Sequence, residues 1–172
     1  MVAEKLKKYL EKIKKEDRKI NSFLFVRNEE DMLKEAKLIE NKIKKGKAGK
    51  LAGYIVGIKA NINVLGLPIS CASKVLENYV GTYDATVIKK IKQEDGLIIG
   101  ILNCDEFACG SSGETSAFGP TRNPVNPDLI AGGSSSGAAA SVKGIKALKR
   151  EPVKVKALQD YHNEIMKNNR KN

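Results

Sequence analysis

The residues whose chemistry stands out are three consecutive serines bracketed by glycines, at positions 132–137 (GGSSSG). Such a loop exposes backbone N–H groups and packs closely, and the small residues after it (AAASV) are able to open a helix whose N-terminus favours an anion. Clustered hydroxyls in that setting indicate nucleophilic or proton-transfer chemistry. We interpret the segment as half of an active site.

Two other interpretations of this loop compete with that one. A Gly/Ser cluster is often only a flexible linker, but this one follows the turn-rich residues 119–127 and leads directly into small apolar residues, which favours an ordered loop. Gly132 and Gly137 also have the spacing of a phosphate-binding loop. That motif requires Lys and Ser or Thr where Ala138 and Ala139 stand, so nucleotide binding is disfavoured.

The second chemical candidate is Lys59, at the end of the apolar run at residues 54–58. That run predicts a buried strand. A lysine in this place is either an ion-pair or surface residue, or a base that burial keeps neutral so that it activates a serine. Ser–Lys catalysis needs no histidine. The single histidine, His162, lies in a segment rich in Lys and Asn and is interpreted as a surface residue.

The elements that must position these residues follow from hydrophobic periodicity. Two amphipathic helices, separated by the apolar residues 23–26, are predicted from apolar positions at helical spacing: Leu6, Leu10 and Ile13, then Leu33, Ala36 and Ile43. A helix is predicted from Asp84 as N-cap to Gln93, and a strand at residues 97–102. Strand, helix and strand in this order predict an α/β fold with a largely parallel sheet.

Composition limits the class of protein. A chain of 172 residues with 41% hydrophobic content can bury one core. The three cysteines show no metal-binding spacing, so reduced thiols and no metal site are expected. The N-terminus opens a charged helix rather than a signal segment, and no apolar stretch is long enough to cross a bilayer, which predicts a cytoplasmic protein without a membrane partner.

The net charge of +11 is unevenly distributed. Residues 1–50 carry +7 and residues 143–172 carry +6, whereas residues 51–142 carry −2. Basic flanks fit either an RNA partner or lysine-rich solvated helix faces. The scarcity of aromatic residues for base stacking favours solvated faces.

Several runs of the chain resemble the amidase signature family. They are residues 57–62 (GIKANI), 71–79 (CASKVLENY) and 103–142. Residues 83–87 (YDATV) and 105–124 are most similar to one branch of that family, the glutamine-hydrolysing subunits of tRNA-dependent amidotransferases. The resemblance covers residues 1–142, with a helical lead-in at 1–50 and the signature core at 51–142, and leaves residues 143–172 as a basic tail.

The resemblance implies a fold and a set of roles. The fold would be the amino-terminal part of the amidase signature fold, a largely parallel mixed sheet flanked by helices. Lys59 would be the base and Ser134 a bridging serine held by a cis peptide bond, while Ser111, Ser112, Ser135 and Ser136 would line or support the substrate pocket. Glutamine would be the substrate. The partners would be other amidotransferase subunits, which use ATP and Mg²⁺, and through them tRNA.

One departure from the family limits what these residues can do. The nucleophilic serine of the family lies downstream of the bridging serine in a run of the type DTGGSIR, but no serine follows Ser141 here, and Leu158 stands near the corresponding position. The sequence therefore predicts a truncated protein without amidase activity of its own. A non-catalytic fragment that binds partner subunits or RNA, and another hydrolase of the family, remain alternatives. Ala60 replaces the aspartate that often follows the base.

Overall fold

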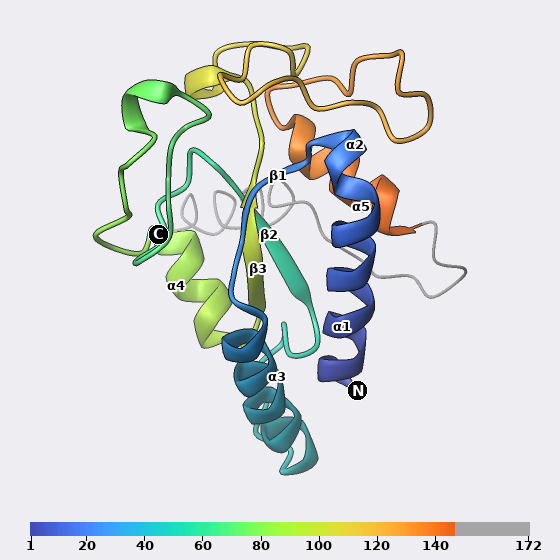
Figure 1. Cartoon of the computed structure of the whole chain (residues 1–172). Helices are drawn as coiled ribbons and strands as arrows, with labels where there is room; N and C mark the ends of the chain where they lie inside the picture. Colours follow the sequence, from blue (N-terminus) through green and yellow to red (C-terminus); the bar gives the residue numbers. More distant parts are fainter. Residues whose placement is uncertain (147–172) are drawn as a thin grey trace, which may run out of the picture.

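The computed structural model describes residues 1–146 and is built around a three-stranded sheet (Figure 1). The strands are β1 (Phe23–Val26), β2 (Ile55–Lys59) and β3 (Leu97–Leu102), in the spatial order β1-β3-β2. β2 runs parallel to β3, whereas β1 is antiparallel to it. The predicted mixed α/β fold is confirmed. The segment predicted as a helical lead-in also contributes a strand, β1.

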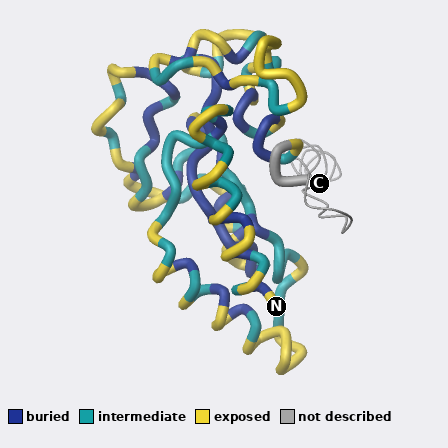
Figure 2. Tube along the Cα trace, turned by 45° about the vertical axis from the view of Figure 1, so that its right-hand side comes forward, coloured by how far each residue is buried: buried dark blue, intermediate teal, exposed yellow. Residues whose placement is uncertain are grey.

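The central strand β3 is buried along its whole length because its sequence, LIIGIL, is continuously apolar (Figure 2). Gly100 allows β1 to approach. A Cβ atom on Gly100 would lie 2.2 Å from the carbonyl oxygen of Phe25, so no larger residue fits without moving β1. β3 therefore forms the rigid centre of the sheet, and both neighbouring strands are placed relative to it.

Two helices cover one part of the sheet. Helices α1 (Val2–Lys12) and α3 (Glu29–Lys44) contact each other, and α3 contacts β3. Their apolar stripes join the strands in one cluster, which contains Val2, Leu6, Tyr9, Leu10, Met32, Ala36, Ile39, Ile55, Leu97 and Ile99. α3 contains the three apolar positions that predicted it, but Ile43, near its end, is 46% exposed. α3 extends beyond the end of the sheet (Figure 1), so its last turn has no strand to pack against.

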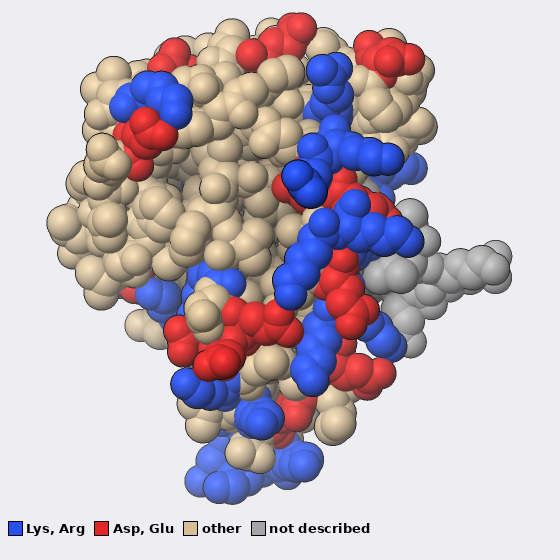
Figure 3. Space-filling view, viewed as in Figure 1, with Lys and Arg blue, Asp and Glu red and all other residues tan. Residues whose placement is uncertain are grey.

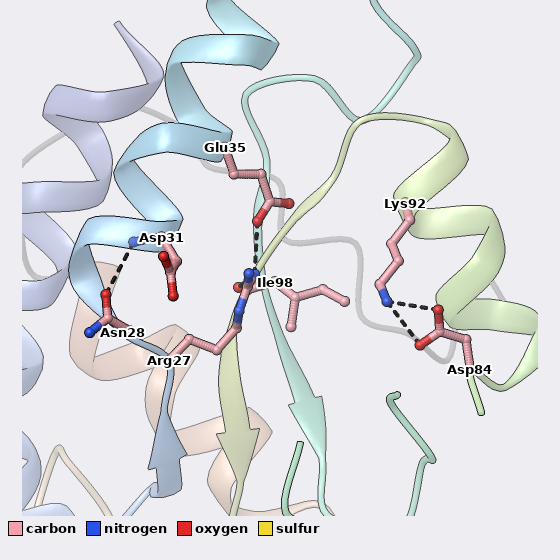
Figure 4. A network of polar contacts seen from close by, with 7 residues as sticks. All are labelled: Arg27, Asn28, Asp31, Glu35, Asp84, Lys92 and Ile98. Atoms are coloured by element: carbon pink, nitrogen blue, oxygen red, sulfur yellow. Dashed lines mark hydrogen bonds and ion pairs between the residues drawn. The ribbon is translucent and has the colours of Figure 1, made fainter. Parts of the chain in front are cut away.

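Polar contacts fix the ends of these elements. α3 begins after Asn28, whose side chain accepts a hydrogen bond from the backbone N–H of Asp31 (Figure 4). Arg27, at the end of β1, donates to Glu35 at 2.9 Å and to the carbonyl of Ile98 at 2.7 Å. The guanidinium thus ties β1, α3 and β3 together.

Helix α4 (Thr86–Gln93) connects β2 to β3, as the strand–helix–strand pattern predicts. Its buried face belongs to a second cluster that includes Ile58, Val64, Ile69, Ile88, Ile91, Ile98 and Ile101. The predicted N-cap is wrong, because Ala85 occupies that position. Asp84 instead accepts from the N–H of Leu65 at 2.9 Å and pairs with Lys92 at 2.7 Å (Figure 4).

The remaining elements are short or lie at the carboxyl ends of the strands. A π-helical turn, η1 (Ile13–Asp17), and α2 (Arg18–Ile20) follow α1, and the 3-10 turns η2 (Lys74–Leu76) and η3 (Glu106–Ala108) interrupt the long loops after β2 and β3. Helix α5 (Ser136–Lys146) contacts β2. α5 continues to Lys146, four residues past residue 142, where the family resemblance is predicted to end. Residues 147–172, which include Leu158 and His162, lie outside the described part.

Candidate active site

The two residues singled out by the sequence lie against each other, although 75 positions separate them in the chain. Lys59 ends β2, and its Nζ donates a hydrogen bond of 2.7 Å to the Oγ of Ser134 in the glycine-rich loop. Both residues are half-buried. The sheet and the loop thus bring an amine and a hydroxyl into contact at the carboxyl end of a parallel strand.

The loop that carries Ser134 is held by backbone contacts on both sides. The Gly133–Ser134 peptide bond is cis, as the family resemblance implies. The N–H of Gly133 donates to the carbonyl of Ser111 at 2.7 Å, and the carbonyl of Ser134 accepts from the N–H of Asp105 at 3.2 Å. These two bonds place Ser134 relative to the segments that follow β3.

The other predicted serines occupy different positions. Ser111 and Ser135 are exposed, and Ser112 is half-buried with its Oγ accepting from the N–H of Glu114 at 3.4 Å. Ser136 is fully buried and donates to the Oγ1 of Thr121 at 3.1 Å. Ser111, Ser112 and Ser135 therefore keep at least part of their surface in contact with solvent, whereas the Ser136 hydroxyl is used in holding α5 against the preceding loop.

Sequence reasoning missed Asp105. This side chain is fully buried beside the Ser134 loop and accepts hydrogen bonds from the Oγ1 of Thr115 at 2.8 Å, the N–H of Thr115 at 3.2 Å and the N–H of Gly113 at 3.1 Å. Burial alone would raise the pKa of Asp105, but these bonds and the charge of Lys59 outweigh it and lower that pKa. A carboxylate three residues after the end of a buried strand was the available signal.

Cysteine is the other residue type able to act as a nucleophile near Lys59. Burial raises the pKa of Cys104 to about 11, although the charge of Lys59 opposes this shift. Burial also raises the pKa of Cys71. Both thiols are thus kept protonated near neutral pH, and neither is an activated nucleophile.

Metal ligands and membrane-spanning segments are not found in the described residues. No group of three or more His, Cys, Asp or Glu side chains in residues 1–146 is arranged to hold a metal ion. Within the same range, no helix combines the length and apolar character that crossing a membrane requires. Each buried side-chain nitrogen or oxygen in this part of the chain has a hydrogen-bond partner.

Comparison with known proteins decides the family. A family model described as Amidase matches residues 4–145. The chain belongs to the amidase family. Among curated members, it is 58% identical over 142 residues to the A subunit of the glutamyl-tRNA(Gln) amidotransferase of Methanocaldococcus jannaschii, a match that covers 83% of this chain and 32% of that protein. The corresponding protein of Methanothermobacter thermautotrophicus is 57% identical over 141 residues, covering 81% and 31%.

Solved amidase structures share the fold. The A subunit of the Thermotoga maritima glutamyl-tRNA(Gln) amidotransferase has a TM-score of 0.66 at 41% identity, covering 81% of this chain and 28% of that one. An inhibitor-bound protein from a vestigial complex related to the origins of an s-triazine catabolic enzyme has a TM-score of 0.78 at 30% identity, covering 84% and 32%. The chain spans about a third of the length of the curated relatives it matches.

Proposed function

We propose that this chain supplies the base and the bridging serine of the glutamine-hydrolysing site in the A subunit of a glutamyl-tRNA(Gln) amidotransferase. Lys59 is the base and Ser134 the bridge. Sequence identity of 58% to a protein with that name supports the branch of the family. The observation that carries the proposal is the 2.7 Å contact between Lys59 Nζ and Ser134 Oγ.

The contact suits a proton relay. A serine hydroxyl both donates and accepts, so Ser134 can receive a proton from a neighbouring nucleophile while passing its own to a neutral Lys59 amine. Direct hydrogen-bond contact is the geometric requirement for such a transfer. Ser135 follows the bridge directly, and the carbonyl of Ser111 holds the peptide that precedes it, so both residues border the place where glutamine would bind.

In this proposal the third member of the relay, the nucleophile, comes from outside these 172 residues. The sequence contains no serine after Ser141, and the thiols of Cys71 and Cys104 are kept protonated. Without a nucleophile the acyl-enzyme cannot form, and losing a covalent pathway costs several orders of magnitude in rate. The 172-residue chain alone is therefore expected to be inactive on glutamine.

The proposed partners follow from the same assignment. Other amidotransferase subunits would receive the ammonia and bind tRNA, and they would use ATP and Mg²⁺ to activate the tRNA-bound glutamate. The setting would be the cytoplasm. A pull-down of those subunits by the purified chain tests the assembly separately from catalysis.

Ammonia release from glutamine tests the catalytic proposal. The chain alone is expected to release none above background. When the carboxy-terminal two-thirds of the Methanocaldococcus jannaschii relative is added as a separate chain, ammonia release is expected to appear. Lys59→Ala and Ser134→Ala should abolish it, whereas Asp31→Asn, which alters an exposed carboxylate far along the chain from both, should not. Turnover by the chain alone, or complemented turnover that survives Lys59→Ala, would contradict the proposal.

A second candidate, RNA binding, is favoured by the distribution of lysines. Around the end of α3, residues 42–47 are all exposed and include four lysines with no acidic residue among them, and they form the blue tip in Figure 3. Phosphate contacts made by such lysines weaken steeply with salt. If RNA binds here, Lys44→Glu should weaken it and reduce the salt dependence, and binding unaffected by salt would exclude this candidate.

Another amidase reaction is the third possibility. The TM-score to the s-triazine-related protein, 0.78, exceeds the 0.66 to the Thermotoga protein, so the fold alone does not separate the branches. Sequence identity does favour the amidotransferase branch. In the complementation assay, release of ammonia from other amides but not from glutamine would identify this alternative.

A further inference from the structure

Asp105 is the point where three segments of the site meet. Its carboxylate is fully buried and accepts from Gly113 and Thr115, while its own N–H donates to the carbonyl of Ser134. Lys59 is close enough for its charge to stabilise the carboxylate. One residue therefore contacts the segment 113–115 through its side chain and the proposed bridge, Ser134, through its backbone N–H, and it lies near Lys59.

Two glycines pack directly on this carboxylate. A Cβ atom on Gly133 would lie 2.0 Å from the Oδ2 of Asp105, and one on Gly110 would lie 2.5 Å from its Cγ. Neither contact leaves room for a side chain. The carboxylate thus fills the space between the loop at 110–115 and the peptide that precedes Ser134.

Hydrogen bonds and short stretches of backbone alternate along the path from the carboxylate to Lys59. Asp105 holds Gly113 and Thr115, and the same loop presents the carbonyl of Ser111, which accepts from the N–H of Gly133 at 2.7 Å. Gly133 precedes Ser134, whose Oγ contacts Lys59. Displacing the carboxylate would release the loop and, with it, one of the two bonds that place Ser134.

We infer that Asp105 is a positioning residue, whose carboxylate holds the loop at 110–115 and thereby keeps the Ser134 hydroxyl against Lys59. This inference rests on the proposed function of Lys59 and Ser134. The carboxylate acts only as an acceptor here. Three donors, the N–H groups of Gly113 and Thr115 and the Thr115 hydroxyl, converge on its Oδ1, and the Gly113 N–H is shared with Oδ2. An amide in the same place would turn its NH₂ group either toward the Gly113 N–H or toward all three donors.

The test measures Lys59 in its protonated, ammonium form by ¹⁵N–¹H NMR of the 172-residue chain, at a pH low enough to keep the amine protonated. The neutral amine of the proposed relay is the same side chain after it has lost that proton. An ammonium held by a hydrogen bond exchanges its protons slowly with water, whereas exposed lysines exchange quickly. The Lys59 signal is assigned by its disappearance in Lys59→Arg. Asp105→Asn is expected to accelerate proton exchange of Lys59 by about tenfold, the scale of a hydrogen bond to a charged group.

The matched control is Asp31→Asn, the same chemical change at an exposed carboxylate whose ion pair, with Lys34, is also exposed. It should leave the Lys59 signal unchanged. If Asp105→Asn retains the fold and the Lys59 exchange rate, Asp105 has only a structural role and the inference is overturned. A lower melting temperature alone, with the Lys59 exchange rate unchanged, overturns it equally.

A second pair of variants covers the case in which Asp105→Asn fails to fold. Thr115 is exposed, so Thr115→Val should fold. It removes one donor from the carboxylate and, on the exposed side, the acceptor of the Glu106 N–H. It is expected to accelerate Lys59 exchange by about fivefold, the scale of one neutral hydrogen bond, and Thr115→Ser should restore the original rate. Equal exchange in Thr115→Val and Thr115→Ser would count against the inference.

Ser134→Ala separates this inference from the proposed function. If Ser134→Ala leaves the Lys59 signal unchanged, Lys59 does not depend on Ser134 and the proposed relay itself fails. If Ser134→Ala accelerates exchange but Asp105→Asn and Thr115→Val do not, the relay stands and only the role of Asp105 is refuted. Acceleration in all three variants supports both.

Discussion

Replacing Gly137 by alanine tests how the serine loop is fastened to the sheet. Gly137 lies in the first turn of α5, where a Cβ atom would lie 2.4 Å from the carbonyl oxygen of Ser22 and 2.6 Å from both the nitrogen and the oxygen of Asn103. All three are backbone atoms. They belong to the residue before β1 and the residue after β3, so no side-chain rotation can relieve the contact.

The expected loss of stability follows from the two backbone hydrogen bonds that the new Cβ atom would disturb. The N–H of Gly137 donates to the carbonyl of Asn103 at 3.0 Å, and the N–H of Asn103 donates to the carbonyl of Ser22 at 2.9 Å. An alanine must break or lengthen both bonds, and a buried polar group left without a partner costs about 1–3 kcal/mol. Glycine to alanine inside a helix otherwise stabilises by about 1 kcal/mol. The net expectation is a loss of about 3 kcal/mol, from two such bonds less the helix gain.

Urea unfolding followed by circular dichroism measures this loss as a change in the free energy of unfolding. Gly132→Ala is the matched control in the same loop, because Gly132 has φ +77° but open space around its Cβ position. Only backbone strain of about 1 kcal/mol is expected there. If Gly137→Ala destabilises the chain no more than Gly132→Ala does, the close packing of α5 on the sheet is not the cause and the reasoning is refuted.

Three further predictions concern the core, the thiols and a buried carboxylate. Leu6→Ala should lower the free energy of unfolding by about 3 kcal/mol in urea titrations, because the Leu6 side chain is fully buried. Mass spectrometry after brief treatment with a thiol reagent at neutral pH should find the exposed Cys109 modified and Cys104, whose pKa is about 11, unmodified. Hydrogen bonds from Lys42 and from the Gly49 N–H lower the pKa of Asp95. A lowered pKa stabilises the fold above the unfolded value of about 4 and loses this effect as pH falls. Asp95→Asn should therefore destabilise the chain in urea at pH 7, and the difference from the unaltered chain should shrink as the pH falls below about 4; a difference independent of pH would contradict this.

The main elements of the fold are predictable from sequence because their apolar patterns are strong. The run LIIGIL at residues 97–102 can only be a buried segment of strand length, and Lys59 follows a similar run. The spacing of Ile43 correctly predicts a helix but not its exposure. Whether Ile43 is covered depends on where the sheet ends, which tertiary structure decides.

The N-cap prediction fails for a related reason. Asp84 has the right residue type for an N-cap, but its carboxylate is taken by the N–H of Leu65 and by Lys92. Leu65 is 19 positions from Asp84 in the chain, and Lys92 lies near the far end of α4, the helix that Asp84 precedes. Competition among partners that the fold brings together cannot be inferred from local sequence.

The residues of the candidate site also fall into those that the sequence predicts and those that only the tertiary structure identifies. Lys59 and Ser134 could be paired from residue type and family resemblance, and the structure places them 2.7 Å apart. Asp105 could not be identified as part of the site, because its importance depends on the loop at 110–115 folding back onto it. A buried carboxylate with three donors has meaning only once those donors are placed.

The contacts that hold Ser134 against Lys59 have a consequence for how a nucleophile would reach them. Among residues 1–146, each of these contacts is made by β2, by the segment after β3 or by the loop before α5, and these segments hold Lys59 and Ser134, the proposed base and bridge, together. Ser111 and Ser135, which flank the bridge, stay exposed. If the proposed function holds, a segment that carries the nucleophile has to approach from this side and does not need to build the proposed relay. Complementation in trans is expected to succeed for this reason, and its dependence on Lys59 decides whether the relay is the one that acts.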